Sequence, residues 1–375
     1  MSGFAFANSR RLVIKVGSSL LVADDGELDR DWLTGLAIDI AELHAAACEV
    51  LVVSSGAIAI GSKVLGISKK KARLEDLQAA AAVGQVQLAH AWREVLQEQD
   101  IRAAQILLTP GDTEDRRRFL NARGTLARLL ERRVVPVINE NDTVATEEIR
   151  YGDNDRLAAR VAQLVMADGL LLLSDVDGFY NADPGTNKEA QHIPEILGIT
   201  PELLAMAGET RSAIGSGGMA TKVQAAKIAT HAGCSTMIAS GVVHRPVQKL
   251  RNGARCSIFR ARGTPAAARK QWLAGSLTVR GRLRIDDGAM SALRDGSSLL
   301  PVGVLGVDGA FERGDVVVIA AQDGRELGRG LAEYGSSDAA RIAGCRSAEI
   351  ESLLGYRSRS VMLHRDELVL FDRDD

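Results

Sequence analysis

Residues 214–222, IGSGGMATK, place three glycines and a serine directly before a segment with helical spacing of apolar residues. Glycine lets backbone N–H groups approach phosphate oxygens closely, and the N-terminus of a helix adds partial positive charge. Lys222 could reach the same phosphates. The stretch is not a Walker A loop, because that motif needs Ser or Thr after the lysine and Val223 follows here. Taken alone, it is also typical of a surface turn.

A second stretch, residues 11–20 (RLVIKVGSSL), indicates the kind of sheet. The run 12–14 is typical of a buried parallel strand. Lys15, Gly17 and Ser18 follow at its end, and open α/β sheets bind ligands beyond the carboxyl ends of their strands. A buried lysine is costly without a partner anion, although a lysine at a strand end can also extend into solvent.

The same pattern recurs along the chain. Short apolar runs end in Gly, Ser, Asn or Asp, and segments with helical spacing, such as 32–47 and 155–167, lie between them. The runs are 50–53, 134–138, 170–173 and 236–239. Alternating strands and helices predict an α/β fold, an αβα sandwich with a mainly parallel sheet. The polar residues that end the strands should gather at one edge of that sheet.

The pattern changes after a basic, alanine-rich stretch, residues 260–270, which contains Pro265. Closely spaced short strands with glycines between them predict a small β-barrel-like unit with little helix. These predicted strands are 277–279, 283–285, 299–302 and 315–319, and residues 287–293 read as a short helix. The predicted division is a first domain over 1–260, a linker over 261–274 and a second domain over 275–375.

Composition limits the classes of protein. The 375 residues carry a formal net charge of −2, 46% are hydrophobic, and the four cysteines show no CxxC spacing. A disulfide framework or a structural zinc site is therefore not expected. No apolar run is long enough to span a bilayer, and the first residues lack the order of a secretory signal. We expect a cytoplasmic protein with no membrane association.

Six motifs in a fixed order resemble the glutamate 5-kinase family, a branch of the amino-acid kinase superfamily. They span about residues 11–241, and residues 275–364 resemble the PUA domain that many members carry. Ser54, Ser174 and Ser216 stand where the family pattern has threonine, and each keeps the hydroxyl. The motifs are IKVGSS, VVSSGAIAIG, VINENDTV, YGDND, LLLSDVDGFYNADP and GSGGMATKVQAAKIA.

The resemblance implies that ATP, with Mg²⁺, phosphorylates the side-chain carboxylate of L-glutamate to L-glutamyl 5-phosphate, the first step of proline biosynthesis. A carboxylate is ionised near neutral pH, so it needs no general base. The site should instead supply cations and oriented N–H groups. The resemblance also implies proline as a feedback inhibitor, a homo-oligomer, and a possible transfer of product to glutamyl phosphate reductase. No protein ligand of Mg²⁺ is assigned.

Site residues follow from the resemblance, position by position. Lys15 and Lys222 would be catalytic, with Asp155 between them orienting both. Ser55, Asp142 and Asn154 would hold glutamate. The nucleotide would contact Lys15, Ser174, Asp175, Ser216, Gly217, Gly218, Met219, Ala220, Thr221 and Lys222.

Several alternatives remain at this stage. Residues 153–155 could be an Asx turn that caps a helix, and 112–118 a solvated helix face. The enzyme could be another amino-acid kinase. An RNA-binding PUA protein is the alternative from a different class, in which Arg280, Arg282 and Arg284 would form a basic stripe; the net charge gives it little support.

Overall fold

The structure, a computed structural model, describes residues 6–23, 26–68, 72–144, 154–208, 218–275, 278–356 and 359–371. The chain separates into two compact units, Met1–Pro265 (the first unit) and Ala266–Asp375 (the second unit). Each has its own buried apolar core. Within the stretch predicted to be a linker, α11 (Pro265–Ala274) is a helix.

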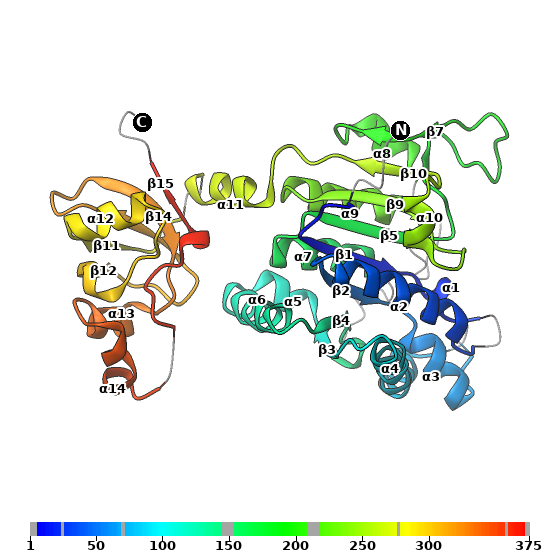
Figure 1. The fold of residues 1–375 in the computed structure, drawn as a ribbon, viewed down its shortest axis with the longest axis horizontal. Coiled ribbons are helices and arrows are strands. Elements are labelled where there is room, and N and C mark those ends of the chain that lie inside the picture. The colour runs from blue at the N-terminus through cyan, green and yellow to red at the C-terminus, as the bar shows by residue number, and fades with distance from the viewer. Residues whose placement is uncertain are drawn as a thin grey trace. The chain divides into compact units, whose positions relative to one another are not determined.

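The first unit is built on a mainly parallel sheet, as predicted (Figure 1). Within the described residues eight strands join in the order β3-β4-β2-β1-β5-β9-β10-β8, and β10 runs antiparallel to β9. A separate hairpin pairs β6 with β7. The strands are β1 (Arg11–Val16), β2 (Glu49–Ser54), β3 (Ala103–Leu108), β4 (Val135–Glu140), β5 (Gly169–Ser174), β6 (Phe179–Tyr180), β7 (His192–Ile193), β8 (Glu195–Ile196), β9 (Ser235–Ser240) and β10 (Cys256–Phe259).

Helices cover both faces of this sheet (Figure 1). Helices α2, α4 and α10 pack on one face, and α6, α7 and α9 pack on the other. The helices of the first unit are α1 (Ser18–Leu21), α2 (Arg30–Ala45), α3 (Ala57–Leu65), α4 (Leu74–Gln97), α5 (Pro110–Glu114), α6 (Arg116–Glu131), α7 (Asn154–Val165), α8 (Pro201–Met206), α9 (Met219–His231) and α10 (Pro246–Arg251), with a 3₁₀ turn η1 (Asp142–Val144).

Strand β1 shows how the sheet directs side chains. Successive side chains of a strand point to opposite faces. Leu12 and Ile14 join the core under α2 and α4, whereas Val13 joins the core under α7 and α9. Lys15 has the same parity as Val13, so it points toward α7 and α9.

Helices α3 and α4 cross at two glycines. A Cβ on Gly61 would lie 1.7 Å from the carbonyl oxygen of Ala80, and a Cβ on Gly84 would lie 1.8 Å from that of Ala57. No side chain fits at those distances, so the two backbones touch directly. Ala57 is the first residue of α3, so this crossing places α4 against the start of α3, just after the end of β2.

The second unit contains a five-stranded sheet within the residues described. The order is β12-β11-β13-β14-β15, in which β11 and β13 are parallel and the other neighbours antiparallel. Its elements are β11 (Gly281–Ile285), α12 (Asp287–Arg294), η2 (Pro301–Gly303), β12 (Val304–Gly309), β13 (Val316–Ala320), β14 (Glu326–Leu331), α13 (Ser336–Ile342), η3 (Ser347–Glu349), α14 (Ile350–Leu354), η4 (Arg365–Glu367) and β15 (Leu368–Leu370).

Some sequence predictions for the second unit were wrong. The expected strand 299–302 is instead a single bridge at Leu299 followed by a 3₁₀ turn from Pro301, because proline lacks the N–H that a strand ladder needs. Residues 278–280 lie outside any strand, and 277 lies outside the described residues. Three α-helices, α12 to α14, exceed the little helix that was predicted, although α12 falls where a short helix was expected.

The three arginines of the basic stripe, Arg280, Arg282 and Arg284, are exposed, and Arg284 pairs with Asp308 at 3.2 Å.

Among the described helices, none has the length and apolarity to cross a membrane.

The Gly84→Ala substitution should strongly destabilise the first unit. Its new methyl group would meet the carbonyl of Ala57, so α3 and α4 must separate. We expect a loss of about 3 kcal/mol and a fall in the Tm of the first unit of roughly 6–10 °C, measured by scanning calorimetry. Gly111→Ala is the matched control, because the nearest atom to its Cβ is 3.7 Å away. Equal Tm values for the two variants would contradict the direct backbone contact.

Candidate active site

Three charged side chains from three elements meet beneath the carboxyl ends of the strands. Lys15 lies on β1, Asp155 in the first turn of α7 and Lys222 in the first turn of α9. The Lys15 Nζ lies 2.6 Å from Asp155 Oδ1, and the Lys222 Nζ lies 3.4 Å from Oδ2. Their exposed fractions are 5%, 1% and 4%. We call these residues the lysine–aspartate triad.

The triad carries a net positive charge in a buried setting. Burial alone would raise the pKa of Asp155, but the charges of Lys15 and Lys222, together with hydrogen bonds from Lys15 and Thr221, hold it below its usual value. Thr221 Oγ1 donates to Asp155 Oδ2 at 2.9 Å. The carboxylate therefore stays ionised between the two ammonium groups. The formal charge of the triad itself is positive, which suits an anion.

The N-terminus of α9 adds to this field. Gly218 is the N-cap residue, and no described side chain caps the helix there. The first N–H groups of a helix have no partner within it, so those of Met219 and Ala220 suit an anion. Gly17, at the end of β1, would carry a Cβ 3.8 Å from the Lys15 Nζ. Ser216 and Gly217 lie outside the described residues.

A cluster of amides and hydroxyls adjoins the triad. Asn154 Nδ2 donates to Ser55 Oγ at 2.7 Å and to Asn139 Oδ1 at 2.9 Å. The backbone N–H of Glu140 also donates to Asn139 Oδ1, at 2.9 Å. Because a backbone N–H can only donate, the atom facing it must be the oxygen, and Asn154 must turn its NH₂ toward Asn139. Asn154 Oδ1 is then a buried acceptor with no partner in the described part of the chain.

Asp142 is the second unbalanced group. It begins the turn η1 and is 9% exposed. Burial raises the pKa of its carboxyl group to about 6. A carboxylate in this position would be stabilised by a nearby cation. Asp142 follows β4, whose Asn139 contacts Asn154, so both acceptors lie at the same edge of the sheet.

The end of β5 holds the residues expected at the nucleotide. Ser174 is buried, and its Oγ donates to Asp175 Oδ1 at 2.8 Å; Asp175 is exposed. Thus the structure connects Lys15, Asp155, Lys222 and Thr221 through direct contacts. Ser55 likewise contacts Asn154 directly. Because Asn154 and Asp155 are consecutive residues, the Asn154 cluster and the lysine–aspartate triad adjoin each other.

Sequence reasoning missed Asn139 and Gln85. Asn139 directly follows the predicted strand 134–138 and stands within the VINENDTV motif, so its place at the sheet edge was a usable signal. Gln85 lies in the middle of α4, and its Oε1 accepts a hydrogen bond from Asn139 Nδ2 at 2.8 Å. No sequence signal marks that contact.

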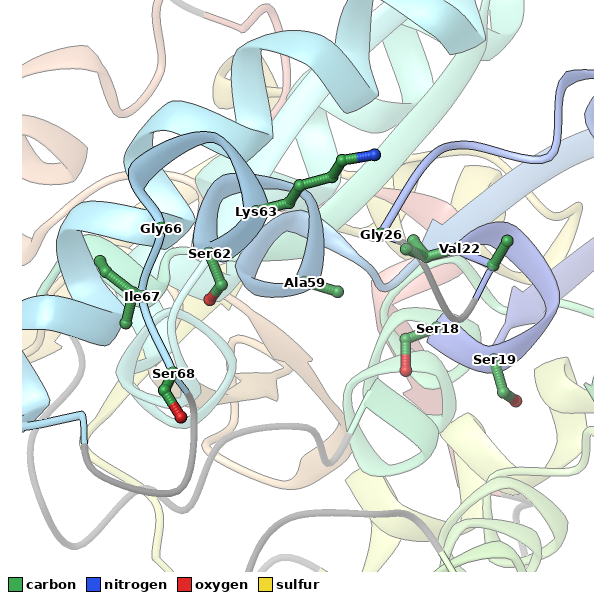
Figure 2. Close-up of a pocket in the computed structure, with 11 residues that line it drawn as sticks. Ser18, Ser19, Val22, Gly26, Ala59, Ser62, Lys63, Gly66, Ile67 and Ser68 are labelled. Carbon is green, nitrogen blue, oxygen red and sulfur yellow. The ribbon is translucent and has the colours of Figure 1, made fainter.

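A cavity of about 620 Å³ is lined by residues of α1 and α3 and of the segments that follow them (Figure 2). Ser18, Ser62 and Lys63 are among its lining residues. The Lys63 ammonium pairs with Glu27, and Ser62 Oγ is buried without a partner among the residues described. Neither the lysine–aspartate triad nor the Asn154 cluster lines this cavity.

Sequence comparison identifies both units. The profile of the amino acid kinase family matches residues 10–240, more than half of the chain. The chain belongs to the amino acid kinase family. The profile of the PUA domain matches residues 281–354, within the second unit. The predicted fold class is thereby confirmed: an amino-acid kinase domain carrying a C-terminal PUA domain.

Relatives within the amino acid kinase family align over nearly the whole chain. A glutamate 5-kinase from Rhodopseudomonas palustris (strain BisB5) is 55% identical over 362 residues, which cover 96% of each chain. One from Rhizobium etli (strain CIAT 652) is also 55% identical, over 364 residues that cover 97% of this chain and 94% of the relative. A solved structure, carbamate kinase from Giardia lamblia bound to AMP-PNP, is 18% identical, with a TM-score of 0.49 over 68% of this chain and 100% of the other.

Asp142→Asn should stabilise the free protein above about pH 6. The folded pKa of about 6 exceeds the unfolded value near 3.8, so stability falls as pH rises between the two. Removing the charge should recover roughly 2–3 kcal/mol at pH 7.5, at 1.36 kcal/mol per pKa unit. Urea denaturation from pH 4 to 8 measures this, and the difference from wild type should vanish toward pH 4. A less stable variant at pH 7.5 would mean that the carboxylate has a cationic partner in the free protein.

Proposed function

We propose that this protein transfers the γ-phosphoryl group of ATP to the side-chain carboxylate of L-glutamate, forming L-glutamyl 5-phosphate. The observation that carries the proposal is the buried lysine–aspartate triad directly beside the Asn154 cluster. The relatives named glutamate 5-kinase, 55% identical over nearly the whole chain, support the same reaction.

The triad suits phosphoryl transfer between anions. The acceptor carboxylate is already ionised, so the main obstacles are repulsion from the phosphates and the charge that moves to the leaving group. Lys15 and Lys222 reduce the repulsion and stabilise the charge on the leaving group, and Asp155 fixes the positions of the two lysines. Because the two ammonium groups are oriented before substrates arrive, little reorganisation is needed as the phosphoryl group moves.

The acceptor side suits an α-amino acid. Asp142 pairs with the α-ammonium of glutamate, and Asn154 Oδ1 accepts one of its N–H bonds. Ser55 and the neighbouring backbone amides at the start of α3 hold a carboxylate. The excess of acceptors on this side and the excess positive charge at the triad orient a zwitterion with its side chain toward the phosphates.

The nucleotide enters as its Mg²⁺ complex. Lys15, Lys222, Gly218 and the first N–H groups of α9 contact its phosphates, and Ser174 and Asp175 contact its nucleoside. Ser216 and Gly217 directly precede Gly218 in the sequence, and their predicted contacts lie outside the described residues. The metal would be held mainly by phosphate oxygens and water, since the carboxylate of Asp155 already pairs with two ammonium groups.

Regulation and assembly are further parts of the proposal. Proline carries the same α-carboxylate and a ring ammonium, so Ser55 and Asp142 can bind it in competition with glutamate. The enzyme forms a homo-oligomer and passes its unstable acyl phosphate to a glutamyl phosphate reductase.

A coupled assay of ADP release tests the function. Glutamate, aspartate, acetylglutamate and uridylate are compared as acceptors at saturating MgATP. Glutamate alone should support turnover. Turnover with another acceptor and not with glutamate would refute the assignment and identify a different amino acid kinase.

Lys15→Ala and Lys222→Ala should each lower kcat by ~10²–10³, because each removes a charge that stabilises the transition state. The affinity for glutamate should change much less. Lys227→Ala, an exposed lysine on the same helix, is the control and should keep normal kcat. Normal turnover in either triad variant would exclude that lysine from catalysis.

Asp142→Asn should raise the KM for glutamate at least tenfold and leave the KM for ATP unchanged, because a charged hydrogen bond contributes about 1.5–3 kcal/mol. In wild type, the same KM should fall as pH rises through about 6, since only the ionised carboxylate pairs with the ammonium. Initial rates at pH 5.5–8 measure both effects. A raised KM for ATP would show that the two subsites are assigned the wrong way round.

A further inference from the structure

Two buried tryptophans reach the site from the helices beneath it. The indole N–H of Trp32, on α2, donates to the carbonyl of Gly241 at 2.6 Å. The indole N–H of Trp92, on α4, donates to Ser54 Oγ at 2.9 Å. Their exposed fractions are 6% and 0%. Both acceptors lie at the carboxyl ends of strands, one on each side of β1.

Trp32 supports the side that carries Ser174. The N–H of Gly241 donates to the carbonyl of Ser174 at 2.7 Å, so the peptide held by Trp32 continues the β5–β9 ladder by one residue. Gly241 is tightly enclosed, since a Cβ there would lie 2.4 Å from Leu20. The backbone N–H of Trp32 is itself held by the N-cap Asp29. The nucleotide end of β5 is therefore tied to the start of α2.

Trp92 supports the side that carries Ser55. Indole can only donate, so Ser54 Oγ accepts its hydrogen bond and keeps its own proton for the carbonyl of Ser55, at 3.3 Å. Ser55 Oγ in turn accepts from Asn154. The indole thus sets the direction of the Ser54 bond, whereas the Asn154–Ser55 bond takes its direction from the Glu140 N–H that orients Asn139.

We propose that Trp32 and Trp92 are positioning residues, each for one subsite: Trp32 for the nucleotide and Trp92 for glutamate. This inference rests on the proposed function and adds how each subsite is held in place by a hydrogen bond from a buried indole. It also gives the Ser54 hydroxyl a role, because a residue without it would leave the buried indole N–H unpaired.

The test is a double comparison of steady-state kinetics in the full-length protein. Trp32→Phe should raise the KM for ATP roughly tenfold, equivalent to about 1.4 kcal/mol, and leave the KM for glutamate within about twofold. Trp92→Phe should do the reverse. Trp272→Phe, in the second unit and 45% exposed, is the matched control and should change neither constant.

Two further variants separate positioning from packing. Ser54→Ala keeps the tryptophan ring but removes its acceptor, and should reproduce the Trp92→Phe effect on glutamate; Ser54→Thr, which keeps the hydroxyl, should retain a normal KM. If Trp32→Phe does not fold, benzothienylalanine at position 32 preserves the ring volume and removes only the N–H donor. It should show the same rise in the KM for ATP.

The outcomes are distinct. Equal shifts in both KM values for each variant, or a fall in stability with both KM values normal, would overturn the proposal and leave the tryptophans as core residues. Wild type that fails to phosphorylate glutamate would refute the proposed function and, with it, the Trp92 half. Calorimetric titration with MgATP would still decide the Trp32 half.

Discussion

The carboxylate of Asp155 is the constraint on which the first unit depends. Its two oxygens hold two buried ammonium groups, and these come from a strand and a helix on either side of it in the chain. An unpaired buried lysine would cost several kcal/mol, so β1, α7 and α9 cannot separate without a large loss of stability. The same carboxylate cannot neutralise both lysines. The interaction that closes the fold thus also gives the triad the positive charge that the proposed chemistry would use.

On the side of the site proposed to bind glutamate, the imbalance is of the opposite kind. There burial raises the pKa of Asp142, and the amide oxygen of Asn154 has no hydrogen-bond donor among the described residues. Each costs stability in the free protein, and under the proposed function each would be satisfied by the ammonium group of glutamate. Excess positive charge and excess acceptors stand side by side because Asn154 and Asp155 are consecutive residues. A single helix start thereby fixes the boundary between two regions of opposite electrostatic character.

Sequence patterns predicted the central strands well because those strands are continuous apolar runs. Strand β3 was not predicted, since its alternate residues are partly exposed and it begins with two alanines. The α3–α4 crossing was also missed, because Gly61 and Gly84 look unfavourable within helices until the facing backbone is known. For the site, the motifs predicted the residues at the strand ends. The supports from Gln85, Trp32 and Trp92 depend on contacts between distant segments, which leave no local pattern.

Strand β1 lies at the middle of the sheet order, with β2 and β4 on one side and β5 and β9 on the other. Under the proposed function, the loops that face the acceptor would arise from one half of this sheet, and those that face the nucleotide would arise from the other. Mutations can change the loops of one half of the sheet without altering those of the other half, provided that β1 and the lysine–aspartate triad are kept. Such a layout allows a lineage to exchange acceptors while it keeps one phosphoryl donor, so that new specificities can arise by changing only the β2–β4 half.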